Sequence, residues 1–306
     1  MLYNEKSLLR LENRPFELYR NRYVRFLREP QEALLKEYFF DHFGRVLDLN
    51  TPKTYNEKLQ WLKINWHDER APLFTDKYEV KFIVESFAKN LKVIPTLECY
   101  ESADEIDISK LPRECVLKAT HGSGFNLFIN DKSSIDNVRV INVFKRIMAV
   151  NYGAVKLECN YLHIQPRIIV EPLIQCPACL PRDYKFYCFH GEVKFVEILN
   201  ACDWHNGNEP VEMIVSREFQ KLDFSYSFRN KLVIEKPPFF DKMVWIAEQI
   251  SRQFPHVRVD LYNFGTDEIY WGECTFFPSS GYGKFLPSVY DEKIGRYLDI
   301  NQIRTI

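Results

Sequence analysis

The sequence predicts an α+β protein of two lobes with a helical N-terminal region. Three patterns in its 306 residues support this fold class. Apolar residues recur at helical spacing over residues 5–70, short β-rich segments begin at residue 93, and a second set of such segments follows residue 170. With 46% hydrophobic and 27% charged residues, the composition is that of a globular chain with a core, which excludes global disorder.

The N-terminal region is expected to consist of several helices. Leu8 and Leu11, and later Leu34 and Leu35, belong to apolar series at helical spacing. Thr54 is followed three residues later by Glu57, ahead of the apolar residues 59–62. This pattern is a capping box, so a helix is predicted to begin there.

The first lobe is expected to combine a small sheet with one helix. Its predicted strands are 93–97, 115–118, 127–129 and 167–170, because each is a short β-rich run bounded by turn formers or charges. Residues 136–148 carry apolar side chains spaced for one helix face.

The second lobe is predicted from a similar alternation of strands with a helix. Its expected elements are strands at 186–189, 191–198, 258–262 and 269–273 and a helix at 240–252.

Charge and hydropathy limit the classes of partner. Lys and Arg number 41 against 42 Asp and Glu, so the chain has no overall basic field and we expect no nucleic-acid partner. No apolar run approaches the roughly 18 residues of a membrane span, and the charged N-terminus does not resemble a secretory signal, so a cytoplasmic location is predicted. Arginines near the N-terminus could make a weak peripheral contact with an anionic surface. The interleaved glutamates favour a solvated amphipathic helix instead.

The eight cysteines are scattered, mostly beside apolar residues, which favours buried reduced thiols over a disulfide framework. Cys176 and Cys179 have the spacing of half a zinc site. No second pair with matching spacing completes it, so a loop with incidental thiols is the better interpretation.

The segment Lys118–Gly124 is the first candidate for a ligand-binding site. A lysine at a strand end precedes a loop with two glycines, whose backbone N–H groups can bind a phosphate while the lysine supplies positive charge. The spacing fits neither a Walker A loop nor the Rossmann pattern. The alternative is a hairpin turn in which glycine provides a positive φ.

A second candidate is the group of charges on the neighbouring strands that contain Arg258, Asp260 and Glu273. Charges on apolar strands are costly to bury unless they are paired or bind a cation. Two carboxylates that meet across strands can hold Mg²⁺, or they can form an ion pair with the arginine, and the sequence leaves both open. Asp183–Lys185 and Glu171–Ile174 add further charged and backbone groups at strand ends.

Taken in order, these segments resemble the TupA-like branch of the ATP-grasp superfamily. The matching segments are Pro52–Lys63, Thr75–Lys77, Leu117–Gly124, Asp131–Lys132, Asp183–Phe186, Arg258–Tyr262 and Gly272–Pro278. The resemblance implies a two-lobed ATP-grasp fold with a helical N-terminal extension. The implied parts are a helical region at 1–70, a reduced pre-ATP segment and linker at 71–110, a small lobe at 111–170, and a large lobe with the metal site at 171–306.

The resemblance also implies that ATP and Mg²⁺ are cofactors, with the nucleotide clamped between the lobes. The implied phosphate ligands are Lys118 and the loop residues His121, Gly122, Ser123 and Gly124, and Lys77 resembles the lysine that reaches toward the nucleotide from the pre-ATP segment. Adenine is assigned to Glu171, Pro172, Leu173 and Ile174, and the ribose to Asp183. The implied metal ligands are Asp260, Glu273 and Thr275. Many ATP-grasp enzymes have Asn where Thr275 stands, so a second metal is left open. Arg258 and Lys185 are the implied catalytic residues, with Arg258 beside the acyl phosphate.

The implied activity is that of an ATP-dependent carboxylate–amine ligase, a carbon–nitrogen ligase that forms an amide through an acyl phosphate. Family context points to an amine or amino acid joined to uronic acid carboxylates of a bacterial capsular or other cell-surface polysaccharide, or of its precursor. Tyr282, Lys284 and Phe285 are expected at the acceptor pocket. Two alternatives stay open: a kinase that phosphorylates a sugar hydroxyl, and a non-catalytic polysaccharide-assembly protein.

Overall fold

The computed structural model describes residues 3–88, 91–174, 182–200, 211–226, 228–264 and 268–304. Internal contacts divide the chain into two compact units. The first unit comprises residues 1–30, 72–81 and 94–174, and the second comprises 31–71, 82–93 and 175–306. The helices within residues 1–70 are therefore shared between the units, with a boundary at residue 30. Within the described residues, no helix is long and apolar enough to cross a membrane.

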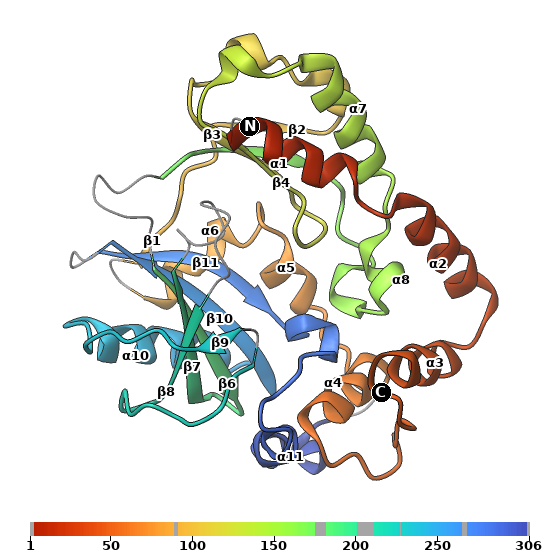
Figure 1. The fold of residues 1–306 in the computed structure, drawn as a ribbon, viewed down its shortest axis with the longest axis vertical. Helices are drawn as coiled ribbons and strands as arrows, with labels where there is room; N and C mark the ends of the chain where they lie inside the picture. Colours follow the sequence, from red (N-terminus) through yellow and green to blue (C-terminus); the bar gives the residue numbers. More distant parts are fainter. Residues whose placement is uncertain are drawn as a thin grey trace. The chain divides into compact units, whose positions relative to one another are not determined.

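The first unit is built on a four-stranded antiparallel sheet in the order β2-β5-β3-β4. Its strands are β2 (Glu98–Tyr100), β3 (Cys115–Ala119), β4 (Asn126–Ile129) and β5 (Ile168–Pro172). Helix α1 (Tyr3–Glu12) packs on β4, and α7 (Asn137–Met148) packs on β3 and on α1 (Figure 1). Two further helices, α2 (Phe16–Arg28) and α8 (Tyr152–Lys156), pack against each other.

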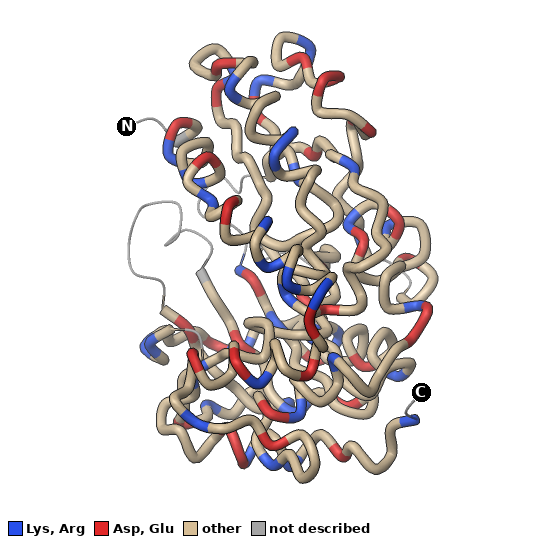
Figure 2. Tube along the Cα trace, turned by 90° about the vertical axis from the view of Figure 1, so that its right-hand side faces the viewer, with Lys and Arg blue, Asp and Glu red and all other residues tan. Residues whose placement is uncertain are grey.

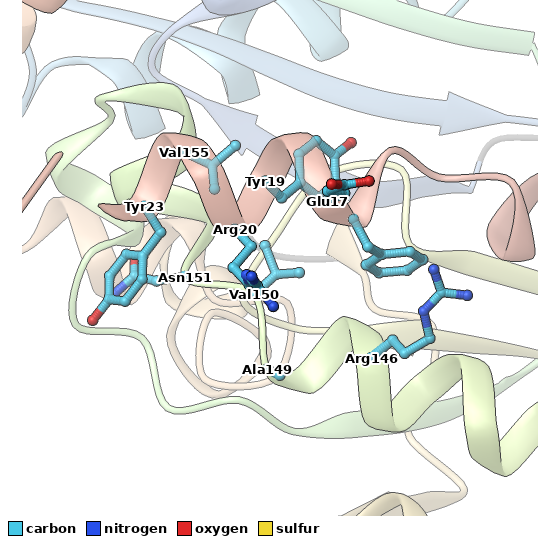
Figure 3. Close-up of a pocket in the computed structure, with 10 residues that line it drawn as sticks. Glu17, Tyr19, Arg20, Tyr23, Arg146, Ala149, Val150, Asn151 and Val155 are labelled. Atoms are coloured by element: carbon cyan, nitrogen blue, oxygen red, sulfur yellow. The ribbon is translucent and has the colours of Figure 1, made fainter. Parts of the chain in front are cut away.

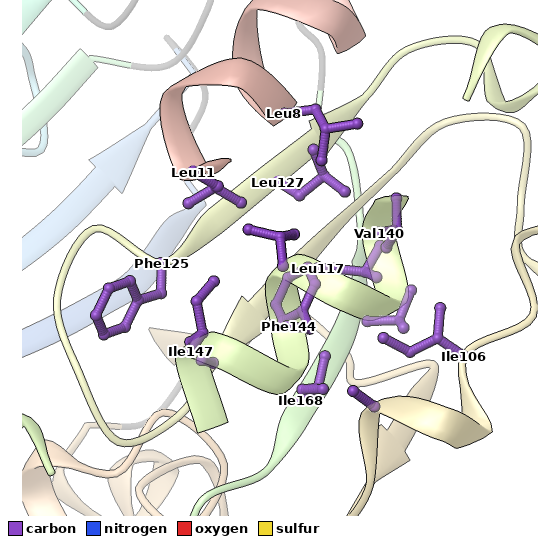
Figure 4. Packing of buried hydrophobic residues seen from close by; sticks show 14 of the residues in the cluster. Leu8, Leu11, Ile106, Leu117, Phe125, Leu127, Val140, Phe144, Ile147 and Ile168 are labelled. Carbon is purple, nitrogen blue, oxygen red and sulfur yellow. The ribbon is translucent and has the colours of Figure 1, made fainter. Parts of the chain in front are cut away.

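The predicted helix at 136–148 is confirmed, and its apolar face forms the core of this unit. Asp136 caps α7 by accepting hydrogen bonds from the backbone N–H groups of Val138 and Arg139. Figure 4 shows Val140, Phe144 and Ile147 of α7 gathered with leucines of α1, β3 and β4. Burial of such side chains contributes roughly 25 cal/mol per Å² of apolar surface, which holds α1 and α7 on the sheet.

The predicted strand at 93–97 is wrong. Strands lie on either side of it, namely β1 (Leu91–Lys92) and β2, whereas residues 93–97 are irregular. Pro95 in the middle of this run has no backbone N–H to donate to a sheet. The backbone oxygen of Ile94 and the hydroxyl of Thr96 instead accept hydrogen bonds from Nζ of Lys81.

The second unit is built on a seven-stranded sheet in the order β1-β11-β10-β6-β7-β8-β9. Its remaining strands are β6 (Arg182–Phe189), β7 (Glu192–Asn200), β8 (Val211–Ser216), β9 (Arg229–Asn230), β10 (His256–Asn263) and β11 (Ile269–Thr275). Helix α10 (Phe240–Ser251) packs on β6, β7 and β10. The ring of Phe186 on β6 contacts Phe240 of α10, so alternate residues of β6, such as Lys185, point to the opposite face.

The predicted capping box is confirmed at the start of α4 (Tyr55–Asn65), where Thr54 and Glu57 exchange hydrogen bonds with each other's backbone N–H groups. Helix α4 packs against α3 (Gln31–Phe43) and α11 (Val289–Gly295). The remaining short helices are α5 (Ala71–Thr75) and α6 (Lys81–Val84). Lys and Arg are interspersed with Asp and Glu along the traced chain (Figure 2).

Candidate functional site

The Lys118–Gly124 segment forms the β3–β4 hairpin of the first unit. Lys118 lies next to the end of β3, and the backbone N–H of Ala119 donates to Phe125 O at 3.1 Å, which closes the loop. Gly124 has a φ of +77°, a conformation that favours glycine. At Gly122 a Cβ atom would lie 2.6 Å from the Phe125 ring, so a larger residue there would require the ring to shift. The backbone of this segment therefore forms the hairpin turn that was the alternative interpretation of the sequence.

Two basic side chains hold the carbonyl groups of this loop. Nζ of Lys77 donates to Gly122 O at 2.6 Å, and a guanidinium nitrogen of Arg14 donates to Gly124 O at 2.6 Å. Ser123 is exposed at the loop, whereas the His121 side chain is buried and its Nε2 lies 3.2 Å from Ile147 O at the end of α7. Burial lowers the pKa of His121 to about 4, so its ring is neutral at pH 7.

A buried carboxylate joins two lysines in the first unit. Glu171 on β5 contacts Nζ of Lys118 with one oxygen and Nζ of Lys81 with the other, both at 2.5 Å. Burial alone would raise the pKa of Glu171, but Lys118 and Lys81 lower it below its ordinary value. The backbone continues through Pro172 to Leu173 and Ile174, which are half-buried. The sequence analysis missed Lys81, because only its contact with the distant residue Glu171 places it in this group.

In the second unit, charged residues align across four strands on the face opposite α10. The strand pairing places Lys185 of β6 directly opposite both Glu197 of β7 and Asp260 of β10. Asp260 in turn lies opposite Glu273 of β11. Because residues opposite each other on adjacent strands share a face, these four side chains form one row.

Arg258 binds all three predicted metal ligands. Its Nη2 atom lies 2.7 Å from Oδ2 of Asp260, 3.1 Å from Oε1 of Glu273 and 3.0 Å from Oγ1 of Thr275. The ion-pair alternative is thus present, and the three oxygens converge on one cationic atom. Burial would lower the pKa of Arg258, but Asp260 and its other neighbours raise it well above the ordinary value, so the guanidinium stays charged.

Lys185 connects Asp183 to Asp260. Its Nζ lies 2.8 Å from Asp183 Oδ2 and 3.3 Å from Asp260 Oδ2. Burial would lower the pKa of Lys185, but the two aspartates raise it above the ordinary value. Burial raises the pKa of Asp183 to about 6; Lys185 opposes the shift and Asp260 adds to it. Asp183 therefore changes protonation closer to neutral pH than an ordinary carboxylate does.

Gly272 sits at a β-bulge that determines where Asp260 and Glu273 meet. The register between β10 and β11 shifts directly after Asp260, so that Leu261 pairs with Trp271 and Gly272 is the extra residue. A Cβ atom on Gly272 would lie 2.7 Å from the backbone oxygen of Asp260. The absence of a side chain at 272 is therefore required for this close approach of the two strands.

A cavity of about 530 Å³ adjoins this charged face. Arg258 and Lys185 contribute to its wall, and the predicted acceptor residues Tyr282 and Lys284 also line it. Phe285 instead is buried and lines a neighbouring cavity. The described wall includes residues that the sequence analysis missed: His42, Glu197 and Tyr226. One feature of the sequence could have identified Glu197 as a candidate site residue: it is a carboxylate in the otherwise apolar run 195–199.

Side chains of the Pro52–Lys63 segment hold the loop that carries Tyr282 in place. From α4, Asn56 donates to Gly283 O at 2.9 Å, Gln60 to Gly281 O at 2.9 Å, and Lys63 to Ser280 O at 2.9 Å. All three α4 side chains are buried. They fix the loop at the edge of the cavity, which explains why polar residues occupy the inner face of this helix.

A second cavity, of about 490 Å³, lies in the first unit between α2 and the end of α7. Its described wall includes Tyr19 and Tyr23 of α2 and Arg146 of α7, which lies 4.0 Å above the Phe16 ring (Figure 3). Its described lining includes none of the predicted site residues.

The described part of the chain contains no group of three or more His, Cys, Asp or Glu side chains arranged to hold a metal ion. Cys176 and Cys179 lie outside the described residues. Among the described cysteines, Cys115, Cys188 and Cys274 are buried free thiols, as the sequence predicts, and Cys99 is a half-buried free thiol.

A family model described as TupA-like ATPgrasp matches residues 57–299. The chain therefore belongs to the TupA-like ATP-grasp family, and the predicted ATP-grasp fold is confirmed. No curated protein matches the sequence.

Several solved structures of ligases align with this one. The ligase PsnB complexed with a minimal precursor is 11% identical and aligns with 68% of this chain and 54% of its own, with a TM-score of 0.37. The L-amino acid ligase from Bacillus licheniformis is 12% identical over 86% of this chain and 58% of its own, with a TM-score of 0.45. The D-alanine–D-alanine ligase from Bacillus anthracis, complexed with ATP, is 14% identical over 74% and 66%, with a TM-score of 0.39. The match to PsnB thus spans about half the length of that chain.

Proposed function

We propose that this chain is an ATP-dependent carboxylate–amine ligase that forms an amide through an acyl phosphate. The observation that carries the proposal is the convergence of oxygens from Asp260, Glu273 and Thr275 on Nη2 of Arg258, in a member of an ATP-grasp family. Two carboxylates and a hydroxyl are hard oxygen donors, the type that Mg²⁺ takes together with phosphate oxygens and water. In this proposal they hold Mg²⁺ when the nucleotide is bound.

The first unit supplies the proposed phosphate ligands. Lys118 and Lys77 contact phosphates, together with the loop from His121 to Gly124, and Lys81 is a further cation beside Lys118. Glu171 holds Lys118 and Lys81 close together in the free protein. Phosphate oxygens that compete for these lysines would take over that role. In the same proposal, Glu171–Ile174 receive adenine and Asp183 lies near the ribose.

The residues of the second unit suit the chemistry of acyl transfer. When bound, Mg²⁺ would neutralise charge on the transferring phosphoryl group, and positioning supplies much of the remaining rate. Arg258 lines the cavity beside the metal ligands and can stabilise the oxyanion formed when an amine attacks the acyl phosphate. Lys185, held by two aspartates, is a second fixed positive charge at the same wall.

The proposed carboxylate substrate is a uronic acid of a bacterial cell-surface polysaccharide or its precursor, and the proposed amine is an amino acid or another amine. The support is the resemblance to the TupA-like branch, together with the cavity wall. Tyr226 and Tyr282 provide rings on which a sugar can stack, and Lys284 provides a cation for a carboxylate. ATP is supplied in the cytoplasm, which is where we propose that the reaction takes place.

The test is ADP release with Mg-ATP from wild type and Asp260→Ala. UDP-glucuronate and oligogalacturonate are each combined with a panel of amino acids and amines. We expect ADP and an amide only when carboxylate and amine are both present, and neither product from the variant. A stable phosphosugar formed without an amine would make the protein a kinase instead. ATP binding without turnover for any combination would favour the non-catalytic alternative.

A further inference from the structure

Glu197 is a buried carboxylate in the wall of the cavity of the second unit. It lies on β7, directly opposite Lys185, and its side chain belongs to the charged row that includes Asp260. Only 1% of the residue is exposed, although it lines a cavity of about 530 Å³. The proposed ligase mechanism so far assigns it no role.

The two carboxylate oxygens of Glu197 differ in their partners. Oε2 accepts a hydrogen bond from the Tyr187 hydroxyl at 2.9 Å, whereas Oε1 has no hydrogen-bond partner within the described parts of the chain. The neighbouring cations do not donate a hydrogen bond to Oε1 either. Nζ of Lys185 is bound by Asp183 and Asp260, and the Arg258 guanidinium is bound by the predicted metal ligands. A buried oxygen without a donor is costly, because it loses hydrogen bonds to water.

Glu212, on the adjacent strand β8, shows what a structural carboxylate in this sheet looks like. Its two oxygens accept hydrogen bonds from the backbone N–H groups of Tyr226 at 2.6 Å and Phe228 at 3.0 Å. Both oxygens of Glu212 thus have a donor supplied by the fold. Glu197 has such a donor on one side only, and the cavity lies beside it.

We propose that Glu197 binds the amine substrate as its ammonium ion and accepts the proton that the amine must lose. This inference rests on the proposed ligase function and supplies the base that the predicted residues lack. An ammonium N–H···Oε1 contact would satisfy the unpaired oxygen with a charge-assisted hydrogen bond. The Tyr187 hydroxyl acts as a positioning group, because it fixes the carboxylate through Oε2.

The proposed step balances in atoms and charge. One ammonium proton passes to Oε1 of Glu197, and the freed nitrogen lone pair attacks the carbonyl carbon of the acyl phosphate. The C–N bond forms, and the C–O bond to phosphate breaks with its electron pair leaving on the phosphate. The second proton of the new amide nitrogen passes to the departing phosphate.

Glu197→Gln separates this role from a structural one. The substitution keeps the shape of the side chain but removes the base, and general bases contribute about 10²–10⁴ in rate. We expect kcat/KM for ethanolamine or glycinamide to fall at least about 100-fold. Hydroxylamine is largely uncharged at neutral pH and needs no base, so hydroxamate formation from UDP-glucuronate or oligogalacturonate with Mg-ATP should change less than about threefold on the same grounds. Glu192→Gln, on the exposed part of the same strand, is the matched control and should change neither rate.

The outcomes distinguish the two proposals. If wild type forms no hydroxamate from either carboxylate, the ligase function fails. If wild type forms it and Glu197→Gln loses both activities equally, the role of Glu197 is structural and this inference is overturned. A binding measurement without ATP provides a second readout: calorimetry should show at least about tenfold weaker ethanolamine binding to Glu197→Gln, the scale of losing a charge-assisted hydrogen bond. Equal affinity in both proteins would contradict the proposal.

Discussion

Asp260 lies directly opposite Glu273 in the antiparallel pairing of β10 with β11, and one nitrogen atom of Arg258 contacts both carboxylates. Asp260 is almost completely buried, with 2% of its surface exposed. The arginine thus balances two buried or half-buried negative charges at the place where the family resemblance assigns Mg²⁺. Because Arg258 contacts both carboxylates, substitutions here should change the stability of the free protein as well as its activity.

Asp260→Asn is expected to destabilise the free protein and to abolish turnover. It leaves the buried Arg258 with a weaker set of partners, and breaking a buried ion pair typically costs about 3–5 kcal/mol in the free energy of unfolding. Urea denaturation without nucleotide measures this cost, and ADP release measures the activity. Asp241→Asn is the control, because its ion pair with Lys236 is exposed and should contribute no more than about 1 kcal/mol. Equal stability of the two variants would contradict the buried pair.

Glu171→Gln is expected to lower stability and to increase the relative stabilisation by ATP. Lys118 and Lys81 lose their shared counter-charge, and Lys81 is largely buried, so the unfolding free energy should fall by about 3–5 kcal/mol. ATP phosphates would restore a negative partner, so the shift in melting temperature on adding ATP should exceed that of wild type. A smaller shift would argue against phosphate binding at this lysine pair. The exposed Glu98→Gln on β2 serves as the control.

Gly272→Ala is expected to disrupt the β10–β11 bulge. The new Cβ would lie 2.7 Å from Asp260 O, which is backbone and cannot move without shifting the carboxylate of the same residue. We expect ADP release to fall by at least about tenfold, because small misplacements of catalytic groups have large effects on rate. Gly44→Ala is the matched glycine control. Gly44 has a φ of +67° and open space around the added atom, so it should cost about 1–2 kcal/mol of stability without loss of kcat.

Acidification should destabilise the protein partly through His121. Its folded-state pKa of about 4 lies below the ordinary value, so the unfolded chain binds the proton first and stability is lost as the pH falls from about 6.5 to about 4. The slope from one such group is at most about 1.4 kcal/mol per pH unit. His121→Gln should reduce the slope of unfolding free energy against pH in this window, and the same substitution at the exposed His67 serves as the control. An unaltered slope in His121→Gln would show that the ring is not buried as a neutral group.

Predictions that rest on interactions within a few residues, such as a helix cap or one helix face, were confirmed. The capping box at Thr54 and the apolar face of 136–148 specify hydrogen bonds and burial within a few residues, so the sequence alone contains the information. The strand expected at 93–97 failed because Pro95 interrupts the run and the sheet partners on either side are distant in the sequence. β-strand formation depends on such partners, which local propensity does not specify.

The sequence by itself determined the family, the two sets of strands and helices, and the chemical types of the candidate ligands, because motif order and residue chemistry are properties of the chain. Only the tertiary structure decided which charges meet. It paired Glu171 with Lys81 as well as Lys118, placed Lys185 between Glu197 and Asp260, and directed α4 side chains to the loop that carries Tyr282. These contacts join residues far apart in sequence, and their energies depend on burial and strand register, which arise only when the sheets have formed.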